Sequence, residues 1–183
     1  MQRYGPELEQ RLRRHLKPTN KSWRVDETYL RVKGRWCYLY WAIDSAGATI
    51  DFLLSALRDA NAAKRLFRNA LSDLSHPPPR VINTDLAPIY GSAIADLKKE
   101  RALRSRCHHR PVQYLNNIIE QDHRAIKRRV KAKQGFREFK AARRTIQGYE
   151  AMNIIRKGQV RWLSRSDVQR QNRFINELFE VAA

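Results

Sequence analysis

Residues 22–56, SWRVDETYLRVKGRWCYLYWAIDSAGATIDFLLSA, decide the fold of this 183-residue chain. They contain three runs rich in β-branched and aromatic residues, which predict β-strands over residues 22–32, 35–44 and 48–56. The connections Lys33–Gly34 and Ser45–Gly47 have the length of hairpin turns, so we expect an antiparallel meander. The run CYLYWAI at 37–43 is apolar on both faces, as is typical of a central strand.

The residues after the meander alternate between helical and strand-like patterns. In order, these patterns predict a helix over 62–74, a strand over 80–84, a helix over 88–100, a strand within 101–113 and a helix over 115–133. Asp59 or Asn61 can cap the first of these helices, and Pro88 suits the first turn of the second. The alternation predicts an α/β domain whose mixed sheet, an antiparallel meander plus parallel strands, is flanked by helices.

Helical patterns also occupy both ends of the chain, at residues 1–17 and 167–181. We therefore expect a connecting helix at 1–20, a central α/β domain at 21–145 and a helical extension at 146–183. The apolar side of the last helix suits docking on its own domain or on another protomer, and the sequence leaves both open. The expected assembly is a homo-oligomer.

The chain is strongly basic, with 37 Lys and Arg against 18 Asp and Glu and a formal net charge of +19. Residues 98–144 hold 16 Lys or Arg and 4 acids, so most of the excess charge lies there. Such a concentration indicates a polyanionic partner. The sequence has no apolar run of 18 residues, no signal peptide and no basic helix with a bulky aromatic face. Nucleic acid is therefore favoured over a membrane, and the expected location is the cytoplasm.

The predicted helix over 115–133 carries a lone carboxylate on a basic ridge. At 3.6 residues per turn, one face holds Glu120, Arg124, Lys127 and Lys131. An apolar stripe roughly a quarter turn away would dock the helix on a core, and it consists of Leu115, Ile119, Ile126 and Val130. Taken alone, Glu120 is also explained by ordinary pairing with Arg and Lys on a solvated helix.

Two further acids stand at positions where a sheet gathers side chains. Asp26 lies inside the first strand, on the same face as Thr28 and opposite to Glu27, and is costly to bury without a partner. Asp85 directly follows the short apolar strand, where open α/β sheets bind ligands, although a turn or capping role would also explain it.

Asp26, Asp85 and Glu120 can meet at one edge of the predicted sheet. Three carboxylates that close repel one another unless cations neutralise them. Magnesium accepts carboxylate and phosphate oxygens as ligands, and a pair of such ions can assist an in-line phosphodiester displacement. The basic ridge beside Glu120 would then hold the backbone of a nucleic acid.

Three segments resemble the catalytic segments of DDE transposases from bacterial insertion sequences. They are WRVDETYLRVKGRWCYLYWAIDSAG at 23–47, PRVINTDLAPIYG at 79–91 and QYLNNIIEQDHRAIKRRVKAKQGF at 113–136. The chain looks most similar to insertion-sequence family six, whose members move by replicative cointegrate formation. The likeness extends over about residues 1–160 and retains the order and spacing of the segments.

The resemblance implies a ribonuclease H-like fold and an enzyme that cleaves and transfers DNA strands. It implies that Asp26, Asp85, Glu120 and Lys127 are the catalytic residues. The three acids would bind two Mg²⁺ (or Mn²⁺) ions. Lys127 matches the basic residue with which this family contacts DNA. The expected DNA-binding residues are Arg124, Lys127, Arg128 and Lys131. The expected partner is double-stranded DNA, both element ends and target, in the bacterial nucleoid.

Family members carry a helix-turn-helix ahead of this domain, and the sequence lacks one. We therefore expect a misassigned start, a truncated gene or a protein that works without its own end-recognition module. One alternative function is an inactive remnant that binds DNA or inhibits a full-length transposase. Another is a structure-selective nuclease, because a fold does not determine a single function.

Overall fold

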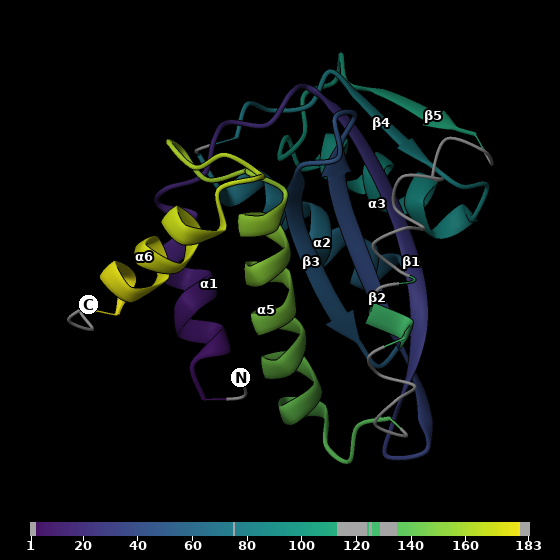
Figure 1. The fold of residues 1–183 in the computed structure, drawn as a ribbon. Coiled ribbons are helices and arrows are strands. Elements are labelled where there is room, and N and C mark those ends of the chain that lie inside the picture. The colour runs from purple at the N-terminus through teal and green to yellow at the C-terminus, as the bar shows by residue number, and fades with distance from the viewer. Residues whose placement is uncertain (1–2, 75, 113–123, 125, 129–134, 180–183) are drawn as a thin grey trace. The chain divides into compact units, whose positions relative to one another are not determined.

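The computed structural model describes residues 3–74, 76–112, 124, 126–128 and 135–179 (Figure 1). The chain forms two compact units, of which one spans Pro18–Arg137. The other joins the two ends of the chain, Met1–Lys17 and Glu138–Ala183. The division into three segments expected from the sequence stays a prediction.

A five-stranded mixed sheet forms the centre of the Pro18–Arg137 unit, with the order β3-β2-β1-β4-β5 (Figure 1). Its strands are β1 (Ser22–Val32), β2 (Arg35–Asp44), β3 (Thr49–Ser55), β4 (Val81–Thr84) and β5 (His108–Pro111). The first three are antiparallel neighbours, whereas β4 runs parallel to both β1 and β5. The predicted meander and mixed sheet are confirmed.

The hairpin between β1 and β2 owes its register to a two-residue turn. Lys33 and Gly34 both have positive φ, 51° and 74°, as a type I′ turn requires. Pairing then runs without interruption from Val32 opposite Arg35 to Trp23 opposite Asp44.

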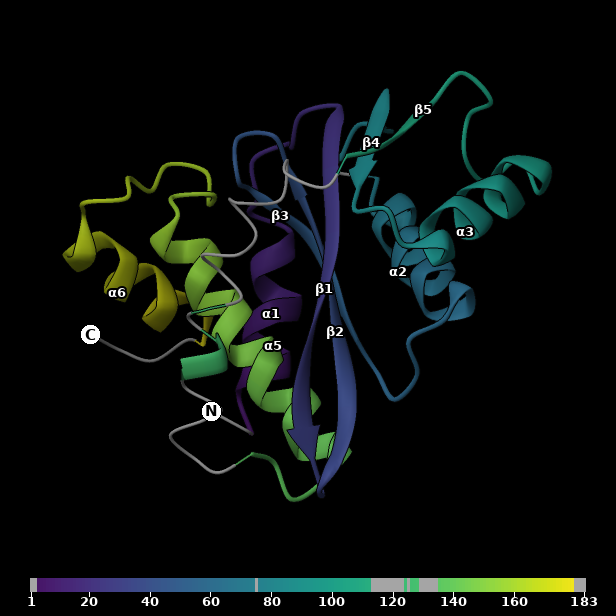
Figure 2. The same ribbon diagram turned by 90° about the vertical axis from the view of Figure 1, so that its right-hand side faces the viewer.

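The parallel pairing between β1 and β4 is short. It joins only Ser22–Arg24 with Val81–Asn83. The hairpin of β1 and β2 therefore continues well past the ends of β4 and β5 (Figure 2). Because β4 ends at Thr84, Asp85 emerges beside the part of β1 that follows its last β4 pair.

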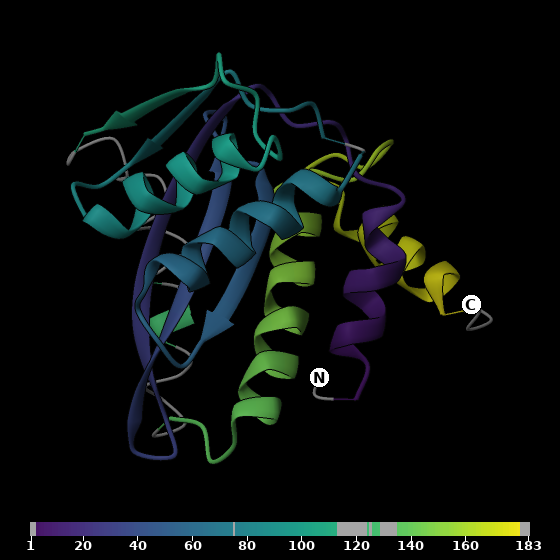
Figure 3. The same cartoon turned by 180° about the vertical axis from the view of Figure 1, so that it is seen from behind.

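Two helices lie side by side against one face of this sheet (Figure 3). They are α2 (Ala60–Ser72) and α3 (Pro88–Lys99). Asp59 caps α2 by accepting a 2.7 Å hydrogen bond from the Ala62 amide, which confirms one of the two predicted caps. At the far end of α3, Glu100 pairs at 2.6 Å with both Lys64 and Arg68 of α2.

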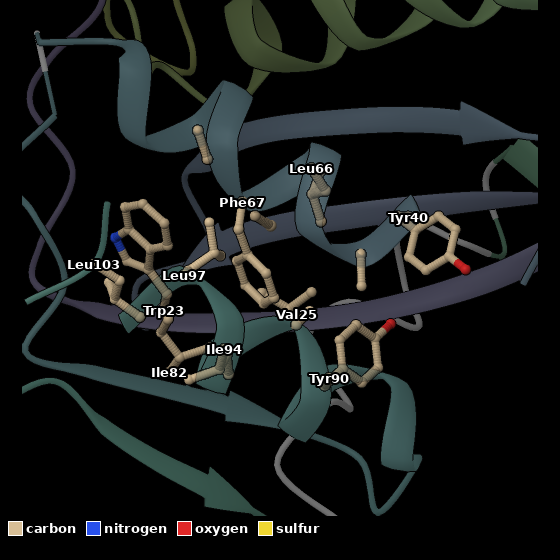
Figure 4. Packing of buried hydrophobic residues seen from close by; sticks show 14 of the residues in the cluster. Trp23, Val25, Tyr40, Leu66, Phe67, Ile82, Tyr90, Ile94, Leu97 and Leu103 are labelled. Atoms are coloured by element: carbon tan, nitrogen blue, oxygen red, sulfur yellow. The ribbon is translucent and has the colours of Figure 1, made fainter. Parts of the chain in front are cut away.

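The core between the sheet and these helices is rich in aromatic residues (Figure 4). The largest buried side chains in it are Trp23, Tyr40, Phe67, Tyr90, Leu66, Ile82, Leu97 and Leu103. The rings of Tyr40 and Tyr90 meet edge to face, with centroids 6.4 Å apart. Both hydroxyl groups lie at one end of the core (Figure 4).

The other unit consists of α1 (Gly5–Arg13), α5 (Phe139–Arg156) and α6 (Val168–Leu178). Its core combines residues from both ends of the chain, namely Leu8, Leu12, Leu16, Ile154, Ile155, Val160 and Leu163. The first helix is shorter than the predicted range of 1–17: it begins after Tyr4 and ends at Arg13. None of the described helices combines the length and apolarity that a membrane crossing requires.

The helix expected over 115–133 falls mostly outside the described residues. Arg124 and 126–128 are helical. Ile126 is buried, while Arg124 and Lys127 are exposed, in agreement with the predicted apolar stripe and basic ridge. Arg128 is exposed as well.

We predict that Gly5→Ala destabilises the unit that contains α1 and α5. A Cβ atom at Gly5 would lie 2.8 Å from the Arg144 carbonyl oxygen and 2.9 Å from the Gly148 Cα, and neither backbone atom can move aside cheaply. The expected loss in the free energy of unfolding is about 1–3 kcal/mol, measured by urea denaturation.

Gly91→Ala is the matched control, because a Cβ there meets only the His109 ring, at 3.9 Å, and Gly91 lies within α3. Helix propensity should make this variant more stable by about 0.5–1 kcal/mol. Equal stability of the two variants would contradict the close packing of α1 on α5.

Candidate active site

Three carboxylates gather where β4 ends beside β1. One oxygen each from Asp26, Glu27 and Asp85 lies within 4.8 Å of the others, and all three residues are partly buried. Side chains of consecutive strand residues point to opposite faces, so Asp26 and Glu27 would normally be separated by the sheet. Here β4 has already ended, and both can reach Asp85 at the open edge.

The loop after β4 orients Asp85. Its Oδ1 accepts a 3.0 Å hydrogen bond from the Ala87 amide, just before Pro88 begins α3. The Thr84 hydroxyl donates to the Asp85 carbonyl at 2.8 Å, and Nε2 of His109 lies 2.9 Å from the same hydroxyl oxygen. Because that hydroxyl has only one proton to give, Nε2 of His109 must be the donor. Burial, and then the nearby Lys98, lower the pKa of His109 and favour its neutral form.

Both carboxylate oxygens of Glu27 accept hydrogen bonds from side chains of the protein. Nε of Arg58 donates to Oε1 at 2.6 Å, and the hydroxyl of Tyr90 donates to Oε2. The Glu27 side chain is only 7% exposed, so these charge-assisted bonds offset the cost of burying its charge. Arg58 is also close enough to Asp85 to feel its charge.

Tyr90 acts in this network as a permanent hydrogen-bond donor. Burial, followed by the negative charge of Glu27, raises the pKa of Tyr90 well above its ordinary value. The negative charges of Asp26 and Asp85 raise the pKa of Tyr90 further, so all three acids lie close enough to Tyr90 to affect its ionisation. The hydroxyl therefore stays protonated at neutral pH.

Asp26 and Asp85 fit a hard divalent cation. Carboxylate oxygens are the ligands that Mg²⁺ takes from proteins, and a spacing of up to 4.8 Å suits acids that share one ion or flank a pair of ions roughly 3.5–4 Å apart. Glu27 supplies the third acid of this group, with Arg58 and Tyr90 already on its oxygens.

The expected DNA-binding residues lie partly within the described structure. Arg124, Lys127 and Arg128 are exposed, and Nζ of Lys127 lies 4.8 Å from the ring centroid of Tyr29. Since Tyr29 follows Glu27 by two residues on β1, Lys127 lies close to the strand that carries the acids. The predicted ligand Glu120 and the predicted DNA contact Lys131 lie outside the described residues.

Comparison with known proteins identifies the family. The family described as a DDE domain, of the IS240 transposase type, matches residues 20–159, most of the chain. The chain belongs to the DDE transposases. Within them it falls in insertion-sequence family six, as its sequence segments predict.

The sequence relatives of this transposase chain include the transposase for insertion sequence-like element IS431mec of Staphylococcus aureus strain Mu50. It is 37% identical over 157 residues, which cover 86% of this chain and 67% of the relative. The transposase for IS257 in transposon Tn4003 of the same species gives the same values. An uncharacterized protein of Yersinia pseudotuberculosis, pYV0051, is 43% identical over 82 residues, covering 44% of this chain and 77% of that protein.

Solved structures confirm the ribonuclease H-like fold. The catalytic core domain of HTLV-2 integrase in complex with magnesium, in its dimeric form, has a TM-score of 0.55 and 17% identity. That comparison covers 81% of this chain and 97% of the integrase core. The catalytic core of BIV integrase also gives 0.55, with 15% identity, over 86% of this chain and 98% of that core. As a DDE transposase, the chain belongs to a family of metal-dependent nucleases and strand transferases.

Glu27, Arg58 and Tyr90 are the site residues that the sequence did not predict. The alternation of a strand places Glu27 away from Asp26, and only the early end of β4 brings the two together. Arg58 precedes α2 and Tyr90 lies in the first turn of α3, so neither belongs to a pattern that marks it. The adjacent acids Asp26 and Glu27 are the sequence feature that could have suggested a role for Glu27 in the site.

We predict that Tyr90→Phe destabilises the transposase by about 1–3 kcal/mol, because it leaves one oxygen of the buried Glu27 without its donor. Tyr40→Phe is the matched control in the same core, since its hydroxyl donates a long 3.4 Å bond to the neutral Leu57 carbonyl, whereas the Tyr90 hydroxyl donates to a charged carboxylate. Urea denaturation of both variants measures the difference. A Tyr90→Phe variant as stable as Tyr40→Phe would show that the Tyr90 to Glu27 bond contributes nothing.

Proposed function

We propose that this chain cleaves DNA at the ends of an insertion sequence and joins the freed ends to target DNA. The proposed ligands of two Mg²⁺ (or Mn²⁺) ions are Asp26, Asp85 and Glu120. Lys127 completes the proposed catalytic residues and would position the substrate DNA. The observation that carries the proposal is the approach of Asp26 to Asp85, from separate strands, to within 4.8 Å. The part assigned to Glu120 rests on the match of its segment to the family.

In the proposed reaction, water attacks a phosphodiester and the 3′ oxygen of the cleaved strand leaves as a hydroxyl. That hydroxyl then attacks a phosphodiester of the target, whose own 3′ oxygen departs. Bound divalent ions would activate the attacking oxygen and stabilise the leaving one. Asp26 and Asp85 fix the position of this chemistry, because each is held by the strand or loop that carries it.

Glu27 and Arg58 have a supporting role in this proposal. Arg58 is held on Glu27 at 2.6 Å and lies near Asp85, so it offsets negative charge beside the metal ligands. The Arg58 side chain is 45% exposed, so its guanidinium group would also be open to a phosphate of bound DNA.

The positive residues of the predicted helix would hold the DNA backbone. Arg124, Lys127 and Arg128 are exposed, and Lys131 follows them in the sequence. Contacts to phosphates fix the position of DNA without reading its sequence. The proposed partner is double-stranded DNA, both the element ends and the target, in the nucleoid of the bacterial cytoplasm.

We also propose a homo-oligomer. The HTLV-2 integrase core has been solved in dimeric and trimeric forms, and the simian T-cell lymphotropic virus intasome has also been solved. Strand transfer joins two DNA molecules, and more than one protomer provides more than one site to hold them.

The test incubates the purified chain with supercoiled plasmid and Mn²⁺, wild type beside Asp85→Asn. The variant should lose nicking and joining by at least a hundred-fold, because it removes a proposed metal ligand. Asp96→Asn is the matched control, since Asp96 is half exposed on α3 and pairs with Lys64 at 3.4 Å, away from the acid cluster. It should cut as wild type does.

The outcome separates the alternative functions. Plasmid binding without cutting by the wild type would favour the inactive remnant. Cutting without joining would favour a nuclease. Equal cutting by wild type and Asp85→Asn would contradict the proposed metal site.

A further inference from the structure

The end of the β1–β2 hairpin carries an exposed group of aromatic and cationic side chains. We call Tyr29, Arg31, Trp36 and Lys127 the aromatic–cation cluster. The rings of Tyr29 and Trp36 meet edge to face with centroids 5.0 Å apart. Cζ of Arg31 lies 4.7 Å from the Trp36 centroid, and Nζ of Lys127 lies 4.8 Å from the Tyr29 centroid.

Packing alone does not account for this cluster. On β1 the buried residues Thr28, Leu30 and Val32 alternate with Tyr29 and Arg31, so the two latter lie on the opposite face. Trp36 pairs directly with Arg31 and shares that face. Tyr29 is 55% exposed and Trp36 49% exposed, so both rings remain available to a ligand.

The cluster has the chemistry of a nucleotide receptor. Each ring has a cation over it, and each nucleotide brings a flat base and a phosphate. A base can stack on the ring while the cation moves from the ring to the phosphate, so the exchange keeps every group paired. The cluster itself contains no acid, and Glu27, the next residue on that face of β1, is already bonded to Arg58 and Tyr90.

The cluster also lies at a useful distance from the acids. Tyr29 follows Glu27 by two residues and Arg31 follows it by four, which corresponds to about 7 and 13 Å along a strand. A DNA strand rises about 3.4 Å per nucleotide. The rings therefore lie about two to four nucleotides from a phosphodiester held at Asp26 and Asp85.

We propose that Tyr29 and Trp36 form a stacking platform for unpaired bases of the DNA strand near the scissile phosphodiester, with Arg31 and Lys127 on its phosphates. This proposal rests on the proposed function, because it takes the acid cluster as the site of cleavage. Bases inside a duplex are stacked on their neighbours, so the occupant is a single-stranded end or an opened stretch. The platform would hold such an end in place for strand transfer.

The test measures binding of the full chain to two DNA duplexes without divalent metal, one blunt and one with a four-nucleotide single-stranded extension that contains 2-aminopurine. Wild type should bind the extended DNA about ten-fold more tightly, as expected for one stacked base, and quench the 2-aminopurine fluorescence. Tyr29→Leu and Trp36→Leu should each reduce both effects. Tyr29→Phe should retain them, because it keeps the ring.

Trp162→Leu is the matched control, since Trp162 is 71% exposed and belongs to the other compact unit. It should leave the preference for extended DNA unchanged. Equal affinity of wild type for blunt and extended DNA would overturn the platform while leaving the proposed DNA-binding function intact, whereas failure to bind either DNA would contradict that function. A change of oligomeric mass in Trp36→Leu, with the preference retained, would assign the cluster to a protein interface and overturn the platform.

Discussion

The short parallel pairing of β1 with β4 is the constraint on which the site depends. Because the two strands share only three residue pairs, β4 ends while β1 continues, and Asp85 emerges beside Asp26 and Glu27. If β4 were longer and paired with β1 beyond Arg24, the sheet would separate the side chains of Asp26 and Glu27 on its two faces. The parallel register of β1 with β4, in which Arg24 lies opposite Asn83, places both acids beside the residues that follow the last pair.

The three acids of the cluster have different roles because of the charges around them. Three carboxylates with oxygens within 4.8 Å repel one another, and Arg58 and Tyr90, which bond to the two oxygens of Glu27, offset part of this repulsion. Asp26 and Asp85 lie beside this ion-paired Glu27. The chain has a net charge of +19 and belongs to a family that uses divalent metal. The same strand goes on to expose Tyr29 and Arg31, so one hairpin carries both the acids and the aromatic–cation cluster.

Local sequence patterns predicted the elements well and the site only in part. The β1–β3 meander and the position of Asp85 follow from turn residues and alternation, which act over a few residues. The roles of Glu27, Arg58 and Tyr90 depend on where β4 stops and on how α2 and α3 pack, and neither is written in a local pattern. The first helix begins later than its periodicity suggests, at Gly5, where a Cβ atom would lie 2.9 Å from the Gly148 Cα. Glu120 stays a prediction.

A crystal structure of the chain soaked with Mn²⁺, with the ions located by anomalous scattering, would show whether Asp26 and Asp85 bind metal. At least one anomalous peak should lie within about 2.0–2.4 Å of carboxylate oxygens from both Asp26 and Asp85, with Arg58 and Tyr90 still bonded to Glu27. Manganese bound elsewhere while the Asp26 and Asp85 carboxylates stay without it would contradict the account, whatever the family resemblance.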